Sequence, residues 1–154
     1  MSLLMADTIR ELKIIEPCLE EYEDKLGHST GLSVCGYDIT LCKKLVIKPG
    51  EFKLSGAVEY FNIPINVGGF IMDKSSWIRK GLTVFNTFLE PGWRGYATIE
   101  LMNHSKHKIK VPKGCTIAQV VFEFLDKPAT KPYHGRYQDQ KLGPQKSIQK
   151  IKNE

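Results

Sequence analysis

From Gly31 onward, short runs of β-prone residues alternate with glycine and proline at intervals of about 8–12 residues. One of these runs, 96–101, alternates apolar and polar residues, as a strand with one buried face does. Another, 117–122, is nearly all apolar and is predicted to be buried on both faces. The pattern predicts an all-β sandwich or barrel, with strands at 37–41, 44–47, 52–54, 58–63, 69–72, 82–88, 96–102, 108–111 and 116–125.

The two ends of the chain follow other patterns. Apolar residues after Asp7 and Thr8 predict a short N-terminal helix, capped by one of these two residues and interrupted by Pro17. The acidic stretch 20–24 is expected on the surface. After Pro128 the sequence becomes polar and rich in lysine, glutamine and proline, which predicts an extended arm with little core of its own. We therefore expect a β domain over 1–128 and a C-terminal arm over 129–154.

The length of 154 residues suits one domain, and 42% hydrophobic with 25% charged residues is the profile of a soluble globular protein. No apolar run approaches the roughly 20 residues that a membrane helix needs, so we expect no membrane partner and a cytoplasmic location. The four cysteines form no CxxC pair, which favours free thiols. Zinc deaminases carry H-x-E followed by P-C-x-x-C. Because this chain has neither motif, any deamination is expected to run without zinc.

The net charge of +5 suits a polyanionic partner, either a nucleoside triphosphate or a nucleic acid. The excess lies late, since residues 127–152 contain seven lysines and arginines and one acid, Asp139. A solvated tail would show the same balance, so charge alone does not choose between these interpretations.

Three groups of residues suggest chemistry. In the first, 73–79, the hydroxyls of Ser75 and Ser76 lie between Lys74 and Arg79, an arrangement that can surround phosphate oxygens. A short helix capped by Asp73 or Ser75 would give the same pattern.

In the second group, Glu90 precedes a Pro-Gly turn, and the strand that follows carries Thr98 and Glu100 on one face. Glu100 is flanked by Ile99 and Leu101, and a carboxylate in such a place is costly unless it is paired or used. The alternative is an exposed acid on the outer face of an alternating strand.

The third group, 133–144, interleaves Tyr133 and Tyr137 with Arg136, Gln138 and Gln140, and such an arm could close over a base or a triphosphate. A disordered polar tail is the alternative.

Together and in this order, these groups resemble the dCTP deaminase/dUTPase superfamily, most closely its dCTP deaminase branch. The resemblance covers most of the chain. It rests on Gly36-Tyr37-Asp38-Ile39, on 48–52 and 59–64, on Lys74-Ser75-Ser76-x-x-Arg79-x-Gly81-Leu82, on Pro91-Gly92-Trp93-x-Gly95 with Glu100, on Pro112-x-Gly114-x-x-Ile117-x-Gln119, and on 133–144.

The resemblance implies a distorted β-barrel that forms homotrimers, with active sites between subunits and the arm folded over a bound dCTP or dUTP. It implies that the triphosphate contacts Lys74, Ser75, Ser76 and Arg79, and that Ser75 also positions water. The pyrimidine would lie against Ala97, Thr98 and Ile99, and Glu90 would stand where the family has an aspartate beside the deoxyribose. Tyr133, Arg136 and Gln140 would close on the phosphates, and Mg²⁺ would bridge phosphate oxygens rather than sit in a protein cage. The implied partner is thus a nucleotide rather than a nucleic acid.

Glu100 decides between the branches. In the deaminase branch a glutamate here shuttles protons between water and the departing ammonia, which favours deamination of dCTP to dUTP. Plain dUTPases usually lack this glutamate and use the earlier acid, here Glu90, to activate water. A dUTPase, a bifunctional enzyme and a non-catalytic protein that binds nucleotide or nucleic acid remain alternatives. Two features depart from the family: 82–90 is about two residues shorter, and Glu90 replaces aspartate.

Overall fold

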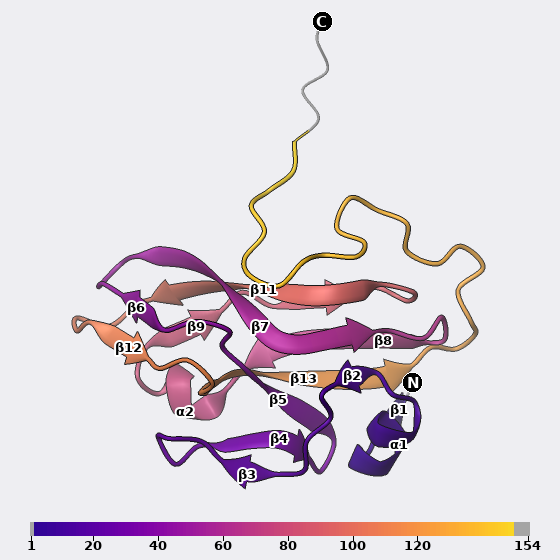
Figure 1. Cartoon of the computed structure of the whole chain (residues 1–154), viewed down its shortest axis with the longest axis horizontal. Helices are drawn as coiled ribbons and strands as arrows, with labels where there is room; N and C mark the ends of the chain where they lie inside the picture. Colours follow the sequence, from indigo (N-terminus) through magenta and orange to yellow (C-terminus); the bar gives the residue numbers. More distant parts are fainter. Residues whose placement is uncertain (1, 150–154) are drawn as a thin grey trace, which may run out of the picture.

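The computed structural model describes residues 2–149 and is built mainly of strands (Figure 1). Its two helices are short: α1 (Ala6–Glu11) and α2 (Ser75–Ile78). The strands are β1 (Ser2–Leu3), β2 (Ile15–Glu16), β3 (Tyr22–Glu23), β4 (Ser29–Ser33), β5 (Gly36–Thr40), β6 (Leu45–Ile47), β7 (Phe52–Asn62), β8 (Val67–Asp73), β9 (Leu82–Val84), β10 (Thr87–Leu89), β11 (Arg94–Asn103), β12 (Ile109–Val111) and β13 (Thr116–Phe124).

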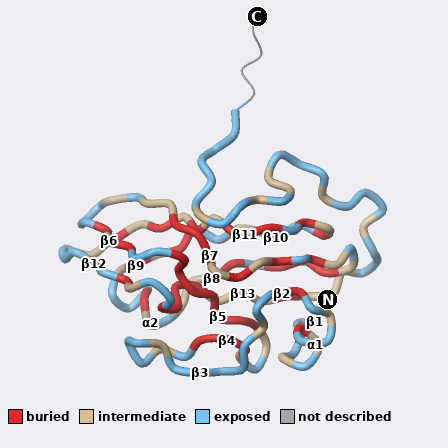
Figure 2. Tube along the Cα trace, viewed as in Figure 1, coloured by how far each residue is buried: buried red, intermediate tan, exposed pale blue. Residues whose placement is uncertain are grey.

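The strands form three antiparallel sheets. The largest has the order β10-β8-β13-β5-β4-β3, with β1 paired to the end of β13; the second has the order β2-β7-β11-β9, and β12 pairs with β6. A bridge between Leu41 and Ala57 joins the first sheet to the second, and the two curl around one core (Figures 1 and 2). The predicted all-β, barrel-like fold is therefore confirmed.

The core is made of aliphatic and aromatic side chains from both large sheets. Burying each such side chain contributes roughly 1.5–3 kcal/mol to folding. In β13, Ile117, Val120 and Phe122 are buried, whereas Gln119 and Val121 are half-buried. One face of the strand is therefore buried as predicted, whereas the opposite face is only partly buried after Ile117.

The expected cap of the N-terminal helix is wrong, and the acidic stretch 20–24 is exposed as expected except at Asp24. Met5, rather than Asp7 or Thr8, precedes α1 as its N-cap, and no side chain caps this helix. Asp24 is not a surface acid: its side chain is 1% exposed, and its carboxylate accepts hydrogen bonds from backbone amides, including that of Thr116 at 2.8 Å. The amides compensate the buried charge, which composition alone does not reveal.

Two strand boundaries also differ from the prediction. The expected strands 52–54 and 58–63 are one strand, β7, which runs without interruption through Gly56. The expected strand 82–88 is divided into β9 and β10, which belong to different sheets.

The arm after residue 128 contains no named helix or strand as far as residue 149, but it is docked on the barrel. The Tyr133 amide donates to the Pro91 carbonyl at 2.8 Å, and Gly95 forms a β-bridge with Gln140. The remainder of the predicted arm, 150–154, lies outside the described residues.

The four cysteines are free thiols, with Cys42 and Cys115 buried and the other two half-buried. Within residues 2–149, no helix combines the length and the apolar character that crossing a bilayer requires.

Candidate active site

A cavity of about 550 Å³ lies between the paired strands β7 and β11, strand β10 and the C-terminal arm. Its walls are mostly apolar and include Phe52, Leu54, Phe88, Tyr133 and Tyr137. The polar groups are few and come from β10, β11 and the arm. Small organic ligands usually bind in cavities with this composition.

Glu100 lines this cavity from β11. Ile99 and Leu101 are buried in the core, so Thr98 and Glu100 lie on the opposite side of the strand, which faces the cavity. The Glu100 carboxylate is half-buried and accepts a hydrogen bond from Thr87 Oγ1 at 3.3 Å. Burial raises the pKa of Glu100, although the hydrogen bonds that it accepts oppose this shift. An acid of raised pKa in an apolar cavity is suited to taking up and returning a proton.

The neighbouring Thr98 fastens the arm to the barrel. Its Oγ1 accepts hydrogen bonds from Gln140 Nε2 and from the Gln145 amide, the latter at 2.8 Å. The Tyr96 amide donates to the Gln140 carbonyl at 3.0 Å, and Gln140 therefore joins β11 through both its side chain and its backbone. Through these hydrogen bonds, the Gln140 side chain holds the arm over the cavity.

Two tyrosines of the arm form the roof of the cavity. Trp93 Nε1 donates to the Tyr137 carbonyl at 2.7 Å, and the Tyr137 amide donates to the Tyr133 hydroxyl at 3.2 Å. Arg136, between them, does not line the cavity: its side chain is exposed and donates to the Ile148 carbonyl at 2.8 Å.

The rim of the cavity carries a second acid, Glu90, in the turn before β11. Its side chain is exposed, and within residues 2–149 its carboxylate has no hydrogen bond or ion pair. It is therefore available to a ligand.

The 74–79 segment lies elsewhere. It contains the short helix that the alternative interpretation allowed, but neither Asp73 nor Ser75 caps it; the N-cap is Lys74, without a side-chain cap. Asp73 Oδ1 instead accepts from the Val84 amide at 2.7 Å. Ser75 and Arg79 are exposed, and none of the four predicted phosphate contacts lines the cavity.

The structure thus brings one part of the predicted site together. Glu90, Ala97, Thr98, Glu100, Tyr133 and Gln140 line one cavity, whereas Ile99 packs in the core and the 74–79 segment and Arg136 lie outside. Among the described residues that line the cavity there is no lysine, arginine or histidine, and its two charged groups are acids. As far as the chain is described, the cavity of one subunit therefore offers no cation to a polyanionic ligand.

Two contacts were missed from the sequence, one within the cavity and one that holds the 74–79 segment. Thr87, which contacts Glu100, lies in a run that reads as a continuous strand and gives no separate signal. Asp38, described further below, did leave one, because an aspartate within the apolar strand 37–41 is costly unless a partner compensates it.

A family model described as dCTP deaminase-like matches residues 14–125. The chain belongs to the dCTP deaminase-like family. It is 32% identical over 136 residues to a protein named dCTP deaminase from Pyrococcus horikoshii, covering 84% of this chain and 87% of that protein. It is 30% identical to a protein of Methanosphaera stadtmanae named dCTP deaminase, dUMP-forming, covering 100% of this chain and 79% of that protein.

Two solved structures that share the fold of this chain are dUTPases. EIAV dUTPase aligns with a TM-score of 0.58 at 19% identity, covering 80% of this chain and 97% of that one. A point mutant of the dUTPase from Staphylococcus aureus phage phi11, described with a structural Mg(II) ion, aligns with a TM-score of 0.58 at 16% identity, covering 79% of this chain and 95% of that one. The resemblance inferred from sequence is thus confirmed, and the family identifies the chain as an enzyme of the hydrolase type.

Proposed function

We propose that this enzyme deaminates dCTP to dUTP and ammonia by zinc-independent hydrolysis, with Glu100 as the general acid and base. The observation that carries the proposal is a half-buried carboxylate of raised pKa in a cavity with aromatic walls. Membership of the dCTP deaminase-like family supports this choice of reaction.

In the proposed reaction, the Glu100 carboxylate takes a proton from water as the water oxygen bonds to C4 of cytosine. Glu100 passes this proton to the ring and then carries the proton of the new hydroxyl to the amino nitrogen. The C4–N bond breaks, ammonia leaves and C4 keeps its oxygen as a carbonyl. The hydrogen bond from Thr87 would help to orient the acid.

The nucleoside would contact Ala97, Thr98 and the Ile99 backbone, with Glu90 beside the sugar. The arm, 129–154, would act as a cover on the 1–128 barrel through Tyr133, Arg136 and Gln140. Because the described residues that line the cavity include no cation, we propose that the triphosphate is bound by Lys74, Ser75, Ser76 and Arg79 of a neighbouring subunit in a homotrimer.

Mg²⁺ fits this site as a companion of the nucleotide. Among residues 2–149 no cluster of three or more histidine, cysteine, aspartate or glutamate side chains could hold a metal ion by itself, so the ion would be held mainly by the nucleotide phosphates. When bound to the phosphates, the ion would neutralise part of their charge. We also propose a cytoplasmic location, because free thiols are typical of reducing compartments.

The test is release of ammonia from dCTP and Mg²⁺ by the purified protein. The variant Glu100→Gln keeps the size of the side chain and the bond from Thr87 but cannot exchange protons. We expect ammonia release to fall by roughly 10²–10⁴-fold while dCTP still binds. Tight binding of intact dCTP without ammonia release by the native protein would exclude the proposed reaction.

A dUTP pyrophosphatase, alone or combined with deamination, is the second candidate. Glu90 at the rim favours it, since this acid is exposed and has no partner within residues 2–149, and it could activate water beside the phosphates. Pyrophosphate release from dUTP, measured in parallel with ammonia release from dCTP, separates the two reactions.

A further inference from the structure

The α2 helix presents two faces, and the residues of the 74–79 segment are divided between them. Lys74 and Trp77, three residues apart, point into the protein, whereas Ser75 and Arg79, four residues apart, are exposed. The Trp77 side chain is 3% exposed, and its Nε1 donates to the Thr116 carbonyl at 2.7 Å. Trp77 thus anchors the helix to the barrel.

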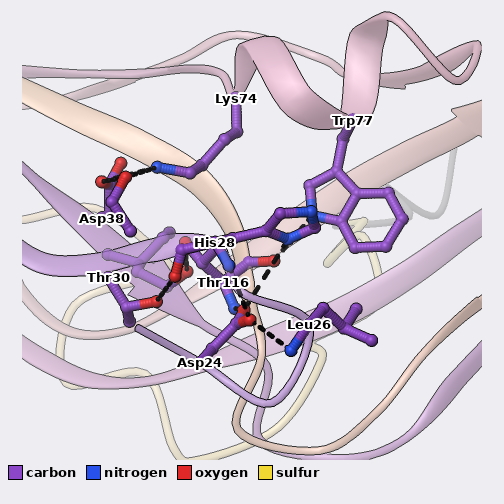
Figure 3. Close-up of polar contacts among 10 residues, drawn as sticks. Asp24, Leu26, His28, Thr30, Asp38, Lys74, Trp77 and Thr116 are labelled. Carbon is purple, nitrogen blue, oxygen red and sulfur yellow. Dashed lines mark hydrogen bonds and ion pairs between the residues drawn. The ribbon is translucent and has the colours of Figure 1, made fainter. Parts of the chain in front are cut away.

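Lys74 is the second anchor, as Figure 3 shows. Its side chain is 11% exposed, and its Nζ donates to Asp38 Oδ2 at 2.6 Å and to Ser29 Oγ at 3.0 Å. Asp38 lies on β5 and Ser29 on β4, so the lysine reaches from the end of β8 past β13 to two further strands. An ammonium held in this way faces the barrel and not the solvent.

The environment of Asp38 makes the pair difficult to separate. The Asp38 side chain is 4% exposed, and its second oxygen, Oδ1, is buried without a hydrogen-bond partner among the described residues. Burial raises the pKa of Asp38, and the Lys74 ammonium opposes that shift. If Lys74 turned outward to a phosphate, it would leave a buried carboxylate without its cation, which is strongly unfavourable.

We propose that Lys74 is a positioning residue: paired with Asp38, it fixes the 74–79 segment so that Ser75 and Arg79 meet the nucleotide phosphates. This inference rests on the proposed nucleotide function and changes the role that the family resemblance suggests for Lys74. In this arrangement Arg79 supplies the cation for the phosphates, and the charge of Lys74 is neutralised inside the protein.

The variant Asp38→Asn tests the proposal, because the two possible roles of Lys74 predict opposite changes in the KM for dCTP. If Lys74 positions the segment, both Asp38→Asn and Lys74→Met raise the KM for dCTP by roughly tenfold, with a much smaller change in kcat. The double variant is then no worse than either single variant, because the two changes remove one interaction. If Lys74 itself binds phosphate, Asp38→Asn frees its ammonium, and KM stays constant or falls, which would overturn the proposal.

Three controls keep the result interpretable. Lys113→Met removes an exposed lysine in the turn before β13 and should leave KM unchanged. Urea unfolding checks that each variant folds. If Asp38→Asn does not fold, Ser29→Ala removes the second acceptor of Lys74 and should raise KM in the same direction by a smaller factor.

A measurement without nucleotide separates this proposal from the proposed reaction. Amide hydrogen exchange of residues 75–81 in the ligand-free protein should accelerate in both Asp38→Asn and Lys74→Met, relative to Lys113→Met. If the native protein binds dCTP but releases no ammonia, the reaction fails while the binding constants still test the role of Lys74. If it binds neither dCTP nor dUTP, the exchange rates alone decide, and unchanged rates would refute the pairing.

Discussion

Glu59 is a buried acid that the proposed reaction does not use. It lies on β7 with 3% of its surface exposed, and its carboxylate accepts hydrogen bonds from the Thr40 amide at 3.1 Å and from Thr40 Oγ1 at 2.9 Å. Within residues 2–149 no cation pairs with it. Burial therefore raises the pKa of Glu59 to about 7, and the hydrogen bonds only partly oppose that rise.

This raised pKa makes the stability of the protein depend on pH. Between the ordinary pKa of 4.5 and about 7, the folded chain holds a proton on Glu59 that the unfolded chain has released. The contribution of Glu59 is therefore complete below pH 4.5 and is lost as the pH rises through 7.

Glu59→Gln should remove this dependence. The amide oxygen can accept both bonds from Thr40, and the side chain has no charge to bury. Between pH 5 and pH 8, we expect the unfolding free energy of the variant to gain roughly 2–3 kcal/mol relative to the native protein. Urea unfolding at the two pH values measures this difference. A difference that stays constant with pH would show that Glu59 is ionised in the folded protein throughout.

At the level of elements, the docked arm explains two glycines of the barrel. A Cβ on Gly95 would lie 2.6 Å from the Gln140 amide nitrogen, and one on Gly56 would lie 2.9 Å from the Gly143 backbone. The arm thus passes directly over β11 and β7, where any side chain would displace it.

Gly95→Ala should therefore release the arm. Its φ of +143° also disfavours a side chain. We expect trypsin to cleave after Arg136 and Lys141 at a rate raised by roughly tenfold or more, because those bonds leave the docked backbone. Gly114→Ala is the matched control: its φ of +76° is also positive, but nothing lies within 4 Å of the added Cβ. Equal cleavage in both variants would show that the arm is not held at Gly95.

The same contacts explain which strands could be predicted from the sequence and which strand boundaries could not. Alternation and turn residues were enough to predict the strands from β5 onward, because these signals depend on neighbours close in the chain, but β1 to β4 were not predicted. Two strands, 52–54 and 58–63, were predicted where the structure has the single strand β7, and Gly56 lies within it, where it leaves room for the arm. The division of 82–88 was missed for a similar reason: β9 and β10 pair with strands of different sheets, and this depends on distant partners.

In the candidate site, too, local features could be predicted from the sequence, whereas contacts between distant residues could not. The acids and the strand residues that line the cavity could be proposed from local pattern and family resemblance, and Glu90, Thr98 and Glu100 do lie there. The inward orientation of the Lys74 side chain could not be predicted from the sequence, because its partner Asp38 lies 36 residues earlier. The closed position of Gln140 likewise depends on Thr98, which is 42 residues away.

At the scale of the whole molecule, the acids of the cavity and the cations of the 74–79 segment are separate. Strands β8 and β10 carry an exposed apolar surface. Phe70 on β8 and Phe88 on the edge strand β10 are 36% and 39% exposed, with ring centroids 4.9 Å apart. An edge strand with exposed aromatic rings is a typical place for another subunit to pack. Both observations support the proposed homotrimer.

Shared sites would allow two inactive variants to restore each other. Glu100→Gln lacks the proton carrier and Arg79→Ala lacks the phosphate cation, so each alone should be nearly inactive. In the proposed trimer, an active site needs Glu100 from one subunit and Arg79 from its neighbour. In a mixed trimer, the Arg79→Ala chain still supplies Glu100, and the Glu100→Gln chain still supplies Arg79. Random assembly makes roughly a quarter of the sites intact. Co-expressed chains should therefore release ammonia from dCTP at about a quarter of the native rate. If both groups act within one chain, every mixed trimer stays as inactive as the two variants measured alone, which contradicts the shared site.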